Sequence, residues 1–233
     1  MIIRQPEIRV PAAELSRDKL VSVERYARVC YKSEGAMLEG GFHPGFLKSI
    51  VSRGHESVIE HEKITVLFIV DRGISHEIVR HRVGSYSQES TRYCNYSADK
   101  FGNEITVIEP YFFTGDDEKY EIWKKACEQM EAGYFALMEA GAQPQEARSI
   151  LPNCLKTEIV VTYNLREWRH FFRMRATAPA HPQMRQVAIP LLKAFQQAFP
   201  ELFSDIQGDE NFPAEKEAKV VLTNELFVPV SEA

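Results

Sequence analysis

The chain has 233 residues, of which 44% are hydrophobic, and a formal net charge of −5 at pH 7. This length and apolar content suffice to bury a core, and we expect one domain over residues 1–233, with its core at about 20–200 and a C-terminal tail at about 203–233. The net negative charge disfavours a general nucleic-acid-binding surface, because neutralising phosphates needs a basic one.

Sequence periodicity predicts alternating strands and helices from residue 63 onward. KITVLFIV (63–70) is short and rich in β-branched residues, which predicts a buried strand. RGISHEIV (72–79) has helical spacing, and EITVIEP (104–110) predicts a second strand that ends at its proline. DDEKYEIWKKACEQMEAGYFALMEAG (116–141) predicts a long helix, with acids at its start and glycine at its end.

The C-terminal half continues this pattern. We expect a short helix between Pro144 and Leu151, a strand at LKTEIVVTYN (155–164) and a helix at 164–176. A further helix at 184–199 should be interrupted or kinked by a proline. The irregular order favours an α+β fold with a central, mostly antiparallel sheet flanked by long helices.

No apolar run reaches eighteen residues, and the segment MIIRQPEIRV lacks the pattern of a secretory signal, so we expect a cytoplasmic protein. The four cysteines contain no CxxC pair, which disfavours a zinc ribbon or a thioredoxin-type site. GHESVIEH (54–61) contains two histidines and two acids. Their spacing matches no helical metal-ligand pattern, and we expect no metal site here. Cys154, in LPNC, is a candidate nucleophile, although a buried inert thiol is the commoner case.

Positive charge is concentrated in RHRVGSYSQESTRY (80–93), which holds three arginines, one histidine, three serines and one threonine. Arg80 and Arg82 could simply complement the dipole of the preceding helix. That reading leaves the hydroxyl groups unexplained. Gly84 suggests that the helix stops and a loop follows. Guanidinium groups with nearby hydroxyls match phosphate oxygens, so we expect a pocket for a small anion here.

The segment NLREWRHFFRMR (164–175) has polar groups on two faces of its predicted helix. One face carries Arg166, His170 and Arg173, and the other carries Asn164, Trp168, Phe171 and Arg175. Two readings are equally supported by this spacing. Either the helix separates two polar environments or lies at a subunit junction, or it is a surface helix with solvated arginines.

The spacing RHRx7S, from Arg80 to Ser90, resembles the signature of the flavin-dependent thymidylate synthases, also called thymidylate synthase complementing proteins. Three further blocks follow the family's order: GHESVIEH upstream, ARSILP (147–152), and NLREWRHFFRMRATAPAHPQMR (164–185). The resemblance covers roughly residues 20–200. It implies a homotetramer with active sites shared between subunits, FAD as cofactor, dUMP as substrate, and methylene-tetrahydrofolate and NADPH as co-substrates.

The resemblance also implies roles for individual residues. Cofactor binding would fall to Ser57, Arg80, His81, Arg82, Gln88, Asn164, Arg166 and His170, with His55 and Glu60 near the flavin or folate. Binding of dUMP would fall to Glu77, Arg80, Gln88, Glu89, Ser90, Thr91, Arg92, Arg148 and Arg175. Arg175 is the implied catalytic residue, which activates the pyrimidine. Ser87, Gln88 and His170 depart from some relatives, and Cys30, where a serine can approach the flavin, receives no role.

Two other functions remain open at this point. The same arginines could serve a nucleotide- or RNA-binding regulator, with Tyr86, Tyr93 and Tyr96 as stacking surfaces. A flavoprotein oxidase without transfer activity is the other alternative.

Overall fold

The computed structural model of the chain describes residues 1–92, 96, 104–113, 115 and 117–230. The chain divides into two compact units. The first unit contains Met1–Pro6, Ile69–Arg80 and Ser87–Ile159, and the second contains Glu7–Phe68, His81–Tyr86 and Val160–Ala233. The expectation of one domain over residues 1–233 stays a prediction.

A five-stranded sheet has the strand order β4-β6-β3-β2-β7. Its strands are β4 (Gly84–Gln88), β6 (Lys156–Asn164), β3 (Lys63–Asp71), β2 (Glu7–Pro11) and β7 (Lys219–Thr223). β2 and β7 are parallel, with Ile8 opposite Val220, so the C-terminal segment contributes a strand to a mixed sheet. Together with the helices, this sheet confirms the α+β fold class.

β3 and β6, both predicted from the sequence, each end in the N-cap residue of a helix. The Asp71 carboxylate at the end of β3 accepts a hydrogen bond from the Ile74 backbone NH (2.8 Å), which starts α3 (Arg72–Ile78). Asn164 at the end of β6 does the same for the Glu167 NH (2.8 Å) and starts α6 (Leu165–Arg175). These two caps determine where the helices that carry the candidate site residues begin.

Gly84 begins strand β4, so the expectation of a loop after the arginine pair was wrong at this residue. The reason is a close approach rather than a turn. A Cβ at Gly84 would lie 2.3 Å from two ring carbons of Tyr163, a distance that real side chains do not tolerate. Glycine therefore lets the strand pass directly over the Tyr163 ring.

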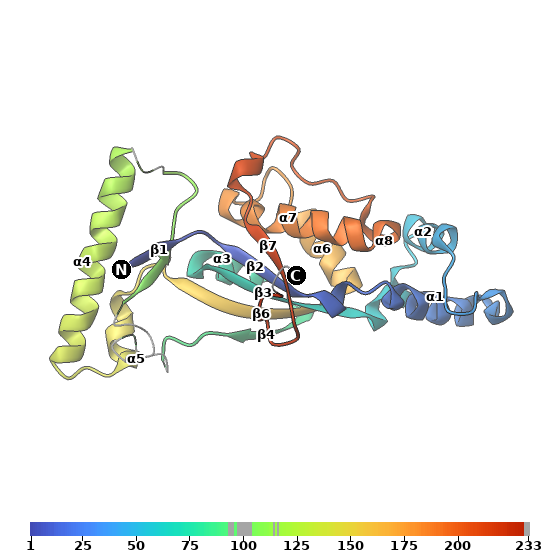
Figure 1. Cartoon of the computed structure of the whole chain (residues 1–233), viewed down its shortest axis with the longest axis horizontal. Coiled ribbons are helices and arrows are strands. Elements are labelled where there is room, and N and C mark those ends of the chain that lie inside the picture. Colours follow the sequence, from blue (N-terminus) through green and yellow to red (C-terminus); the bar gives the residue numbers. More distant parts are fainter. Residues whose placement is uncertain (93–95, 97–103, 114, 116, 231–233) are drawn as a thin grey trace. The chain divides into compact units, whose positions relative to one another are not determined.

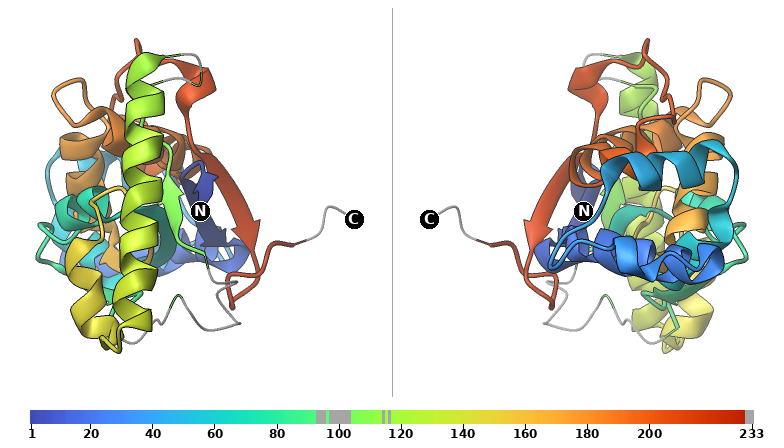
Figure 2. Two further views of the ribbon diagram at one scale, coloured as in Figure 1. Left: turned by 90° about the vertical axis from the view of Figure 1, so that its left-hand side faces the viewer. Right: turned by 90° about the vertical axis from the view of Figure 1, so that its right-hand side faces the viewer.

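The first unit contains a two-stranded parallel sheet and the long helix α4. The elements are β1 (Ile2–Arg4), β5 (Thr106–Ile108), α3, α4 (Glu118–Glu139), α5 (Pro144–Ala147) and a 3-10 turn at Arg148–Ile150. Cys127 and Tyr134 of α4 pack with Val107 of β5 and Leu155 in one buried cluster. α5 lies beside one end of α4, as Figure 2 shows on its left. The predicted long helix and the short helix after it are confirmed.

The second unit contains most of the helices. They are α1 (Asp18–Tyr31), α2 (Pro44–Ser52), α6, α7 (Pro182–Ala198) and α8 (Pro200–Phe203), with 3-10 turns at Ala12–Leu15, Glu34–Ala36, Glu56–His61 and Ala214–Lys216. α6 and α7 lie side by side (Figure 1). Their contact is aromatic: the ring centroid of Phe195 lies 5.2 Å from that of Trp168 and 5.1 Å from that of Phe172. Among the described helices, none has the length and apolar character that a membrane crossing needs.

α7 runs through Pro190 without a break, although an interruption was one of the expected outcomes. Proline cannot donate to the carbonyl four residues earlier, which belongs to Gln186. That carbonyl instead accepts a hydrogen bond from the Ala218 backbone NH (2.8 Å), directly before β7. The C-terminal segment thus supplies the donor that Pro190 removes.

Candidate functional site

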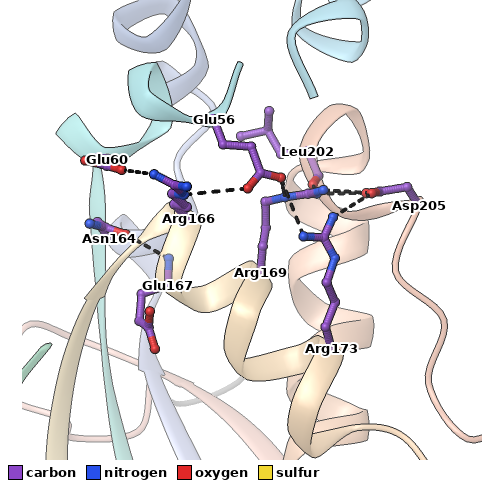
Figure 3. Close-up of polar contacts among 9 residues, drawn as sticks. All are labelled: Glu56, Glu60, Asn164, Arg166, Glu167, Arg169, Arg173, Leu202 and Asp205. Atoms are coloured by element: carbon purple, nitrogen blue, oxygen red, sulfur yellow. Dashed lines mark hydrogen bonds and ion pairs between the residues drawn. The ribbon is translucent and has the colours of Figure 1, made fainter. Parts of the chain in front are cut away.

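An arginine cluster extends along α6 in the second unit, and Figure 3 shows its contacts. Arg169 is fully buried and donates to Glu56 (2.9 Å) and, through two parallel bonds, to Asp205 (2.7 and 2.8 Å). It also donates to the Leu202 carbonyl. Burial alone would raise the pKa of Asp205, but the bonds from Arg169 outweigh it and hold that pKa below its usual value. Arg169 therefore connects α6 to the 3-10 turn that begins at Glu56 and to the segment Leu202–Asp205.

Two cavities in the second unit share Glu56 and Arg166. One, of about 400 Å³, is lined on its other side by Cys30, Tyr31 and residues 54–58, which include the predicted His55 and Ser57. The other, of about 570 Å³, is lined by Glu56, Glu60, Val83, Asn164, Arg166, Glu167, His170 and Arg173. The predicted residues Glu60, Asn164, Arg166 and His170 are thereby brought together at one cavity, where Arg166 is paired with Glu60.

His81, the middle residue of the RHR motif, is buried and connects two residues of α6. Its Nδ1 lies 2.9 Å from a Glu167 carboxylate oxygen, and Arg175 Nε donates to its Nε2 (3.1 Å). Its ring packs on those of Phe171 and Tyr163, with centroids 5.1 and 6.0 Å apart. Burial, together with the charges of Arg175 and His170, lowers the pKa of His81 from 6.5 to about 4, so its imidazole is neutral at pH 7.

The geometry at His81 also has the ligand types of a metal site. Ligand atoms of His81, Glu167 and His170 lie within 4.8 Å of one another. However, Arg175 Nε already donates to His81 Nε2, and its guanidinium places a permanent positive charge next to any cation bound there. These contacts favour the hydrogen-bonded arrangement over metal binding.

The buried neutral His81 predicts a loss of stability in acid. Because its pKa of about 4 lies below the ordinary 6.5, the unfolded chain takes up this proton first as the pH falls. The contribution is complete above pH 6.5, and between pH 6.5 and 4 the free energy of unfolding should fall by about 3 kcal/mol. Urea unfolding at pH 7, 5.5 and 4.5 measures this loss. In His81→Gln the pH dependence should be shallower by that amount, and identical slopes in both proteins would contradict the assignment.

In the first unit, the predicted nucleotide-binding residues of segment 88–92 lie beside α5 and the turn that follows it. Arg148 donates to the Thr91 hydroxyl (3.4 Å), and Arg92 donates to the Gln145 side chain (3.2 Å). The Ser90 hydroxyl accepts from the Arg92 backbone NH (3.3 Å). Two guanidinium groups and two hydroxyls thus gather in one place, which is the donor set that binds phosphate oxygens.

The remaining predicted residues of segment 88–92 have structural partners within the first unit. Gln88 donates to the hydroxyls of Ser75 (2.9 Å) and Thr157 (3.2 Å). Glu89 accepts from Lys156 (2.9 Å), a residue without a predicted role. Burial would lower the pKa of Lys156, but its bonds to Glu158 and Glu89 outweigh this and raise it, so Lys156 stays charged.

The other predicted residues lie at helix ends and on exposed positions. Glu77 is on the last turn of α3, Arg80 follows that helix, and both Arg80 and Arg82 are exposed. The structure also shows which groups sequence reasoning missed, namely Glu56, Lys156, Glu167 and Arg169. Each forms an ion pair or a hydrogen bond with a residue far away in the chain, and no local spacing marks such a partner.

Cys154 lies 3.5 Å from Cys127, sulfur to sulfur, inside the first unit. The hydrogen bond from Cys127 lowers the pKa of Cys154 and raises that of its partner. Cys154, the candidate nucleophile of the sequence, therefore has a structural partner in the packed cluster around α4. Cys94 and Tyr93 lie outside the described residues.

Comparison with known proteins places these features in a family. The family described as thymidylate synthase complementing protein matches residues 13–201. A protein named flavin-dependent thymidylate synthase from Geobacter sulfurreducens is 34% identical over 194 residues, which cover 81% of this chain and 82% of the relative. A protein of the same name from Mycobacterium avium is 35% identical over 202 residues, covering 79% and 78%.

A similar solved structure is that of a UMP/dUMP methylase, PolB, from Streptomyces cacaoi, bound to 5-Br dUMP. Its TM-score is 0.68, and the match covers 88% of this chain and 96% of that one. The identity is 19%, so this likeness concerns the fold.

Proposed function

Since the chain belongs to the thymidylate synthase complementing protein family, we propose that it is a flavin-dependent thymidylate synthase. It would convert dUMP to dTMP with methylene-tetrahydrofolate as one-carbon donor, FAD as redox carrier and NADPH as reductant. The observation that carries this proposal is the family match over residues 13–201, because that range contains all four sequence blocks that resemble the family.

Two cavities and several hydrogen-bond donors of the second unit support the binding of FAD there. The two cavities of about 400 and 570 Å³ fall in the size range of cofactor pockets. Arg166 offers a guanidinium group for phosphate oxygens, while His55, Ser57 and Asn164 offer hydrogen bonds. Because Asn164 Oδ1 caps α6, a contact with the cofactor falls to its amide nitrogen. When bound, FAD would carry the reducing electrons and pass the one-carbon unit to the pyrimidine.

The first unit supports binding of the dUMP phosphate. Arg148, Thr91, Ser90 and Arg92 lie within hydrogen-bonding contact of one another or of α5. Their hydroxyl and guanidinium donors would replace the water that a phosphate loses on binding. We further propose that the enzyme is a homotetramer whose active sites are shared between subunits, with the nucleotide contacted by segment 88–92 of a neighbouring chain.

Arg175 would activate the uracil ring. Methyl transfer to C5 requires this carbon to become nucleophilic, and a cation near O4 and N3 would stabilise the ionised, electron-rich form of the uracil ring from which C5 reacts. An arginine keeps its charge throughout, since its pKa exceeds about 12. His81 is neutral at pH 7 and does not compensate this charge. No protein nucleophile is needed in this scheme.

The flavin tests the proposal against the alternative of a nucleotide- or RNA-binding regulator. The purified protein reconstituted with FAD should be yellow. Under anaerobic conditions NADPH should bleach its absorbance at about 450 nm, because reduction of the flavin removes this band. A colourless protein that takes up no FAD and binds RNA with strong salt dependence would instead support the regulator.

Ser90→Ala should weaken dUMP binding while leaving the chemistry intact. One hydrogen bond to a charged phosphate contributes about 1.5–3 kcal/mol, so the KM for dUMP should rise about 10- to 100-fold. The kcat at saturating dUMP should stay within about twofold, because the lost contact serves binding in ground and transition states alike. Steady-state kinetics on Ser90→Ala, with the exposed Ser87→Ala as control, measures both constants. Loss of all activity at saturating dUMP would show that Ser90 does more than bind.

A further inference from the structure

We propose that Glu167 is a positioning residue that acts through His81 to orient the guanidinium of Arg175. The inference rests on the proposed function, because that function makes the direction of Arg175 matter. Glu167 belongs to none of the residue sets that the family resemblance implies. Its carboxylate points away from the arginine cluster of Figure 3 and reaches His81 instead.

One permanent proton, on Arg175 Nε, determines the direction of both hydrogen bonds that link Glu167, His81 and Arg175. Arg175 Nε always carries a hydrogen, so His81 Nε2, 3.1 Å away, must accept with its lone pair. A neutral imidazole has a single N–H, which must then be on Nδ1. Glu167 lies 2.9 Å from Nδ1 and must accept that hydrogen. Glu167 thus selects the tautomer that Arg175 needs.

The relay orients Arg175 without neutralising it. A carboxylate bonded directly to the guanidinium would form an ion pair and reduce the field available to a substrate. Here a neutral imidazole stands between the two charges, and it occupies Nε rather than the two terminal nitrogens. The imidazole therefore fixes the Nε edge of the guanidinium.

Both groups behind Arg175 are themselves held in place. The backbone NH of Glu167 is bonded to the Asn164 cap (2.8 Å), at the first turn of α6. The His81 ring packs against Phe171 and Tyr163, and its backbone carbonyl accepts from the Tyr86 hydroxyl. Rotation of the imidazole would break its bond to Glu167 and its ring contacts with Phe171 and Tyr163 together, so the position of Nε2 is well defined.

Two variants of Glu167 separate positioning from charge. Glu167→Leu has a similar volume but no acceptor, so the Nε2–H tautomer becomes accessible and its hydrogen opposes that of Arg175. Glu167→Gln keeps an oxygen that can accept from Nδ1. The matched control is Glu201→Leu, since Glu201 is also a buried acid of the second unit, paired with Arg17 (2.7 Å) and remote in role from the cavities.

The measurement is dTMP formation by the FAD-loaded protein, with kcat and the KM for dUMP determined separately. Glu167→Leu should lose about 10- to 100-fold in kcat, the range found when partners behind metal ligands are removed, with KM and FAD affinity changed by less than about threefold. Glu167→Gln should recover most of kcat. Glu201→Leu should lower the melting temperature and leave kcat within about twofold.

The outcomes distinguish this inference from the function on which it rests. If the wild type forms dTMP and Glu167→Leu has the same kcat, or if Glu167→Gln is as slow as Glu167→Leu, the positioning role is wrong. If Glu167→Leu is recovered only as unfolded protein, a wild-type kcat in Glu167→Gln supports the inference and a 10-fold or larger loss overturns it. If the FAD-loaded wild type forms no dTMP at all, the proposed function itself fails.

Discussion

Arg175→Ala is expected to lower kcat for dTMP formation by about 1,000-fold, near the limit for removing one charge-stabilising donor. The guanidinium supplies the positive charge proposed to polarise the pyrimidine, and alanine leaves nothing in its place. FAD should still bind, because Arg166, Asn164 and His170 line their cavity independently of residue 175. Single-turnover kinetics measures the rate of dTMP formation, and a titration with FAD measures the affinity for the cofactor.

Arg175→Lys is the matched variant for this prediction. Lysine keeps a positive charge but has no Nε–H for His81 and no planar fork. We expect Arg175→Lys to have a kcat between that of the wild type and that of Arg175→Ala. Normal turnover in Arg175→Ala would show that the charge of this residue plays no part in the chemistry.

Arg169→Ala is expected to lower the free energy of unfolding by about 3–5 kcal/mol, as for other buried ion pairs that lose one partner. Arg169 is fully buried, and its removal leaves Glu56 and the Leu202 carbonyl without their bonds to it. Urea unfolding at pH 7 and a fixed protein concentration measures the change.

Arg173→Ala provides the comparison on the same helix. Arg173 contacts the same two acids, Glu56 (3.6 Å) and Asp205 (3.2 Å), but its side chain is 47% exposed. Exposed ion pairs contribute about 0–1 kcal/mol, so this variant should be nearly as stable as the wild type. Equal losses in the two variants would mean that burial does not set the importance of Arg169.

The elements predicted from sequence are those whose local pattern is strong. The runs of β-branched residues in β3 and β6 mark strands without reference to the rest of the chain, while the alternating burial of β6 is visible only in the structure. β2 and β7 are five residues each; β2 lies between β3 and β7 in the sheet, and β7 pairs with it across about the whole chain length. No local pattern specifies such a pairing, because it depends on tertiary contacts.

The same distinction applies to the candidate site. The two faces of α6 could be read from spacing, but spacing supported a helix between polar environments and a helix with solvated arginines equally. The structure supports parts of both, since Arg166 and Arg173 are exposed while Arg169 is buried between two acids. Glu167 was invisible as a functional candidate because its partner, His81, is 86 residues away. Burial in the fold, rather than residue type, makes that pair unusual.

Transfer of an isotopic label tests the central claim most directly. The FAD-loaded protein is mixed with dUMP, NADPH and methylene-tetrahydrofolate that carries ¹³C in its methylene group. The account predicts dTMP labelled at the C5 methyl, and mass spectrometry of the acid-quenched protein should find no nucleotide attached to a cysteine. Two results would contradict this account. One is recovery of all the nucleotide as unlabelled dUMP, and the other is a covalent adduct at Cys154 that forms and decays with turnover.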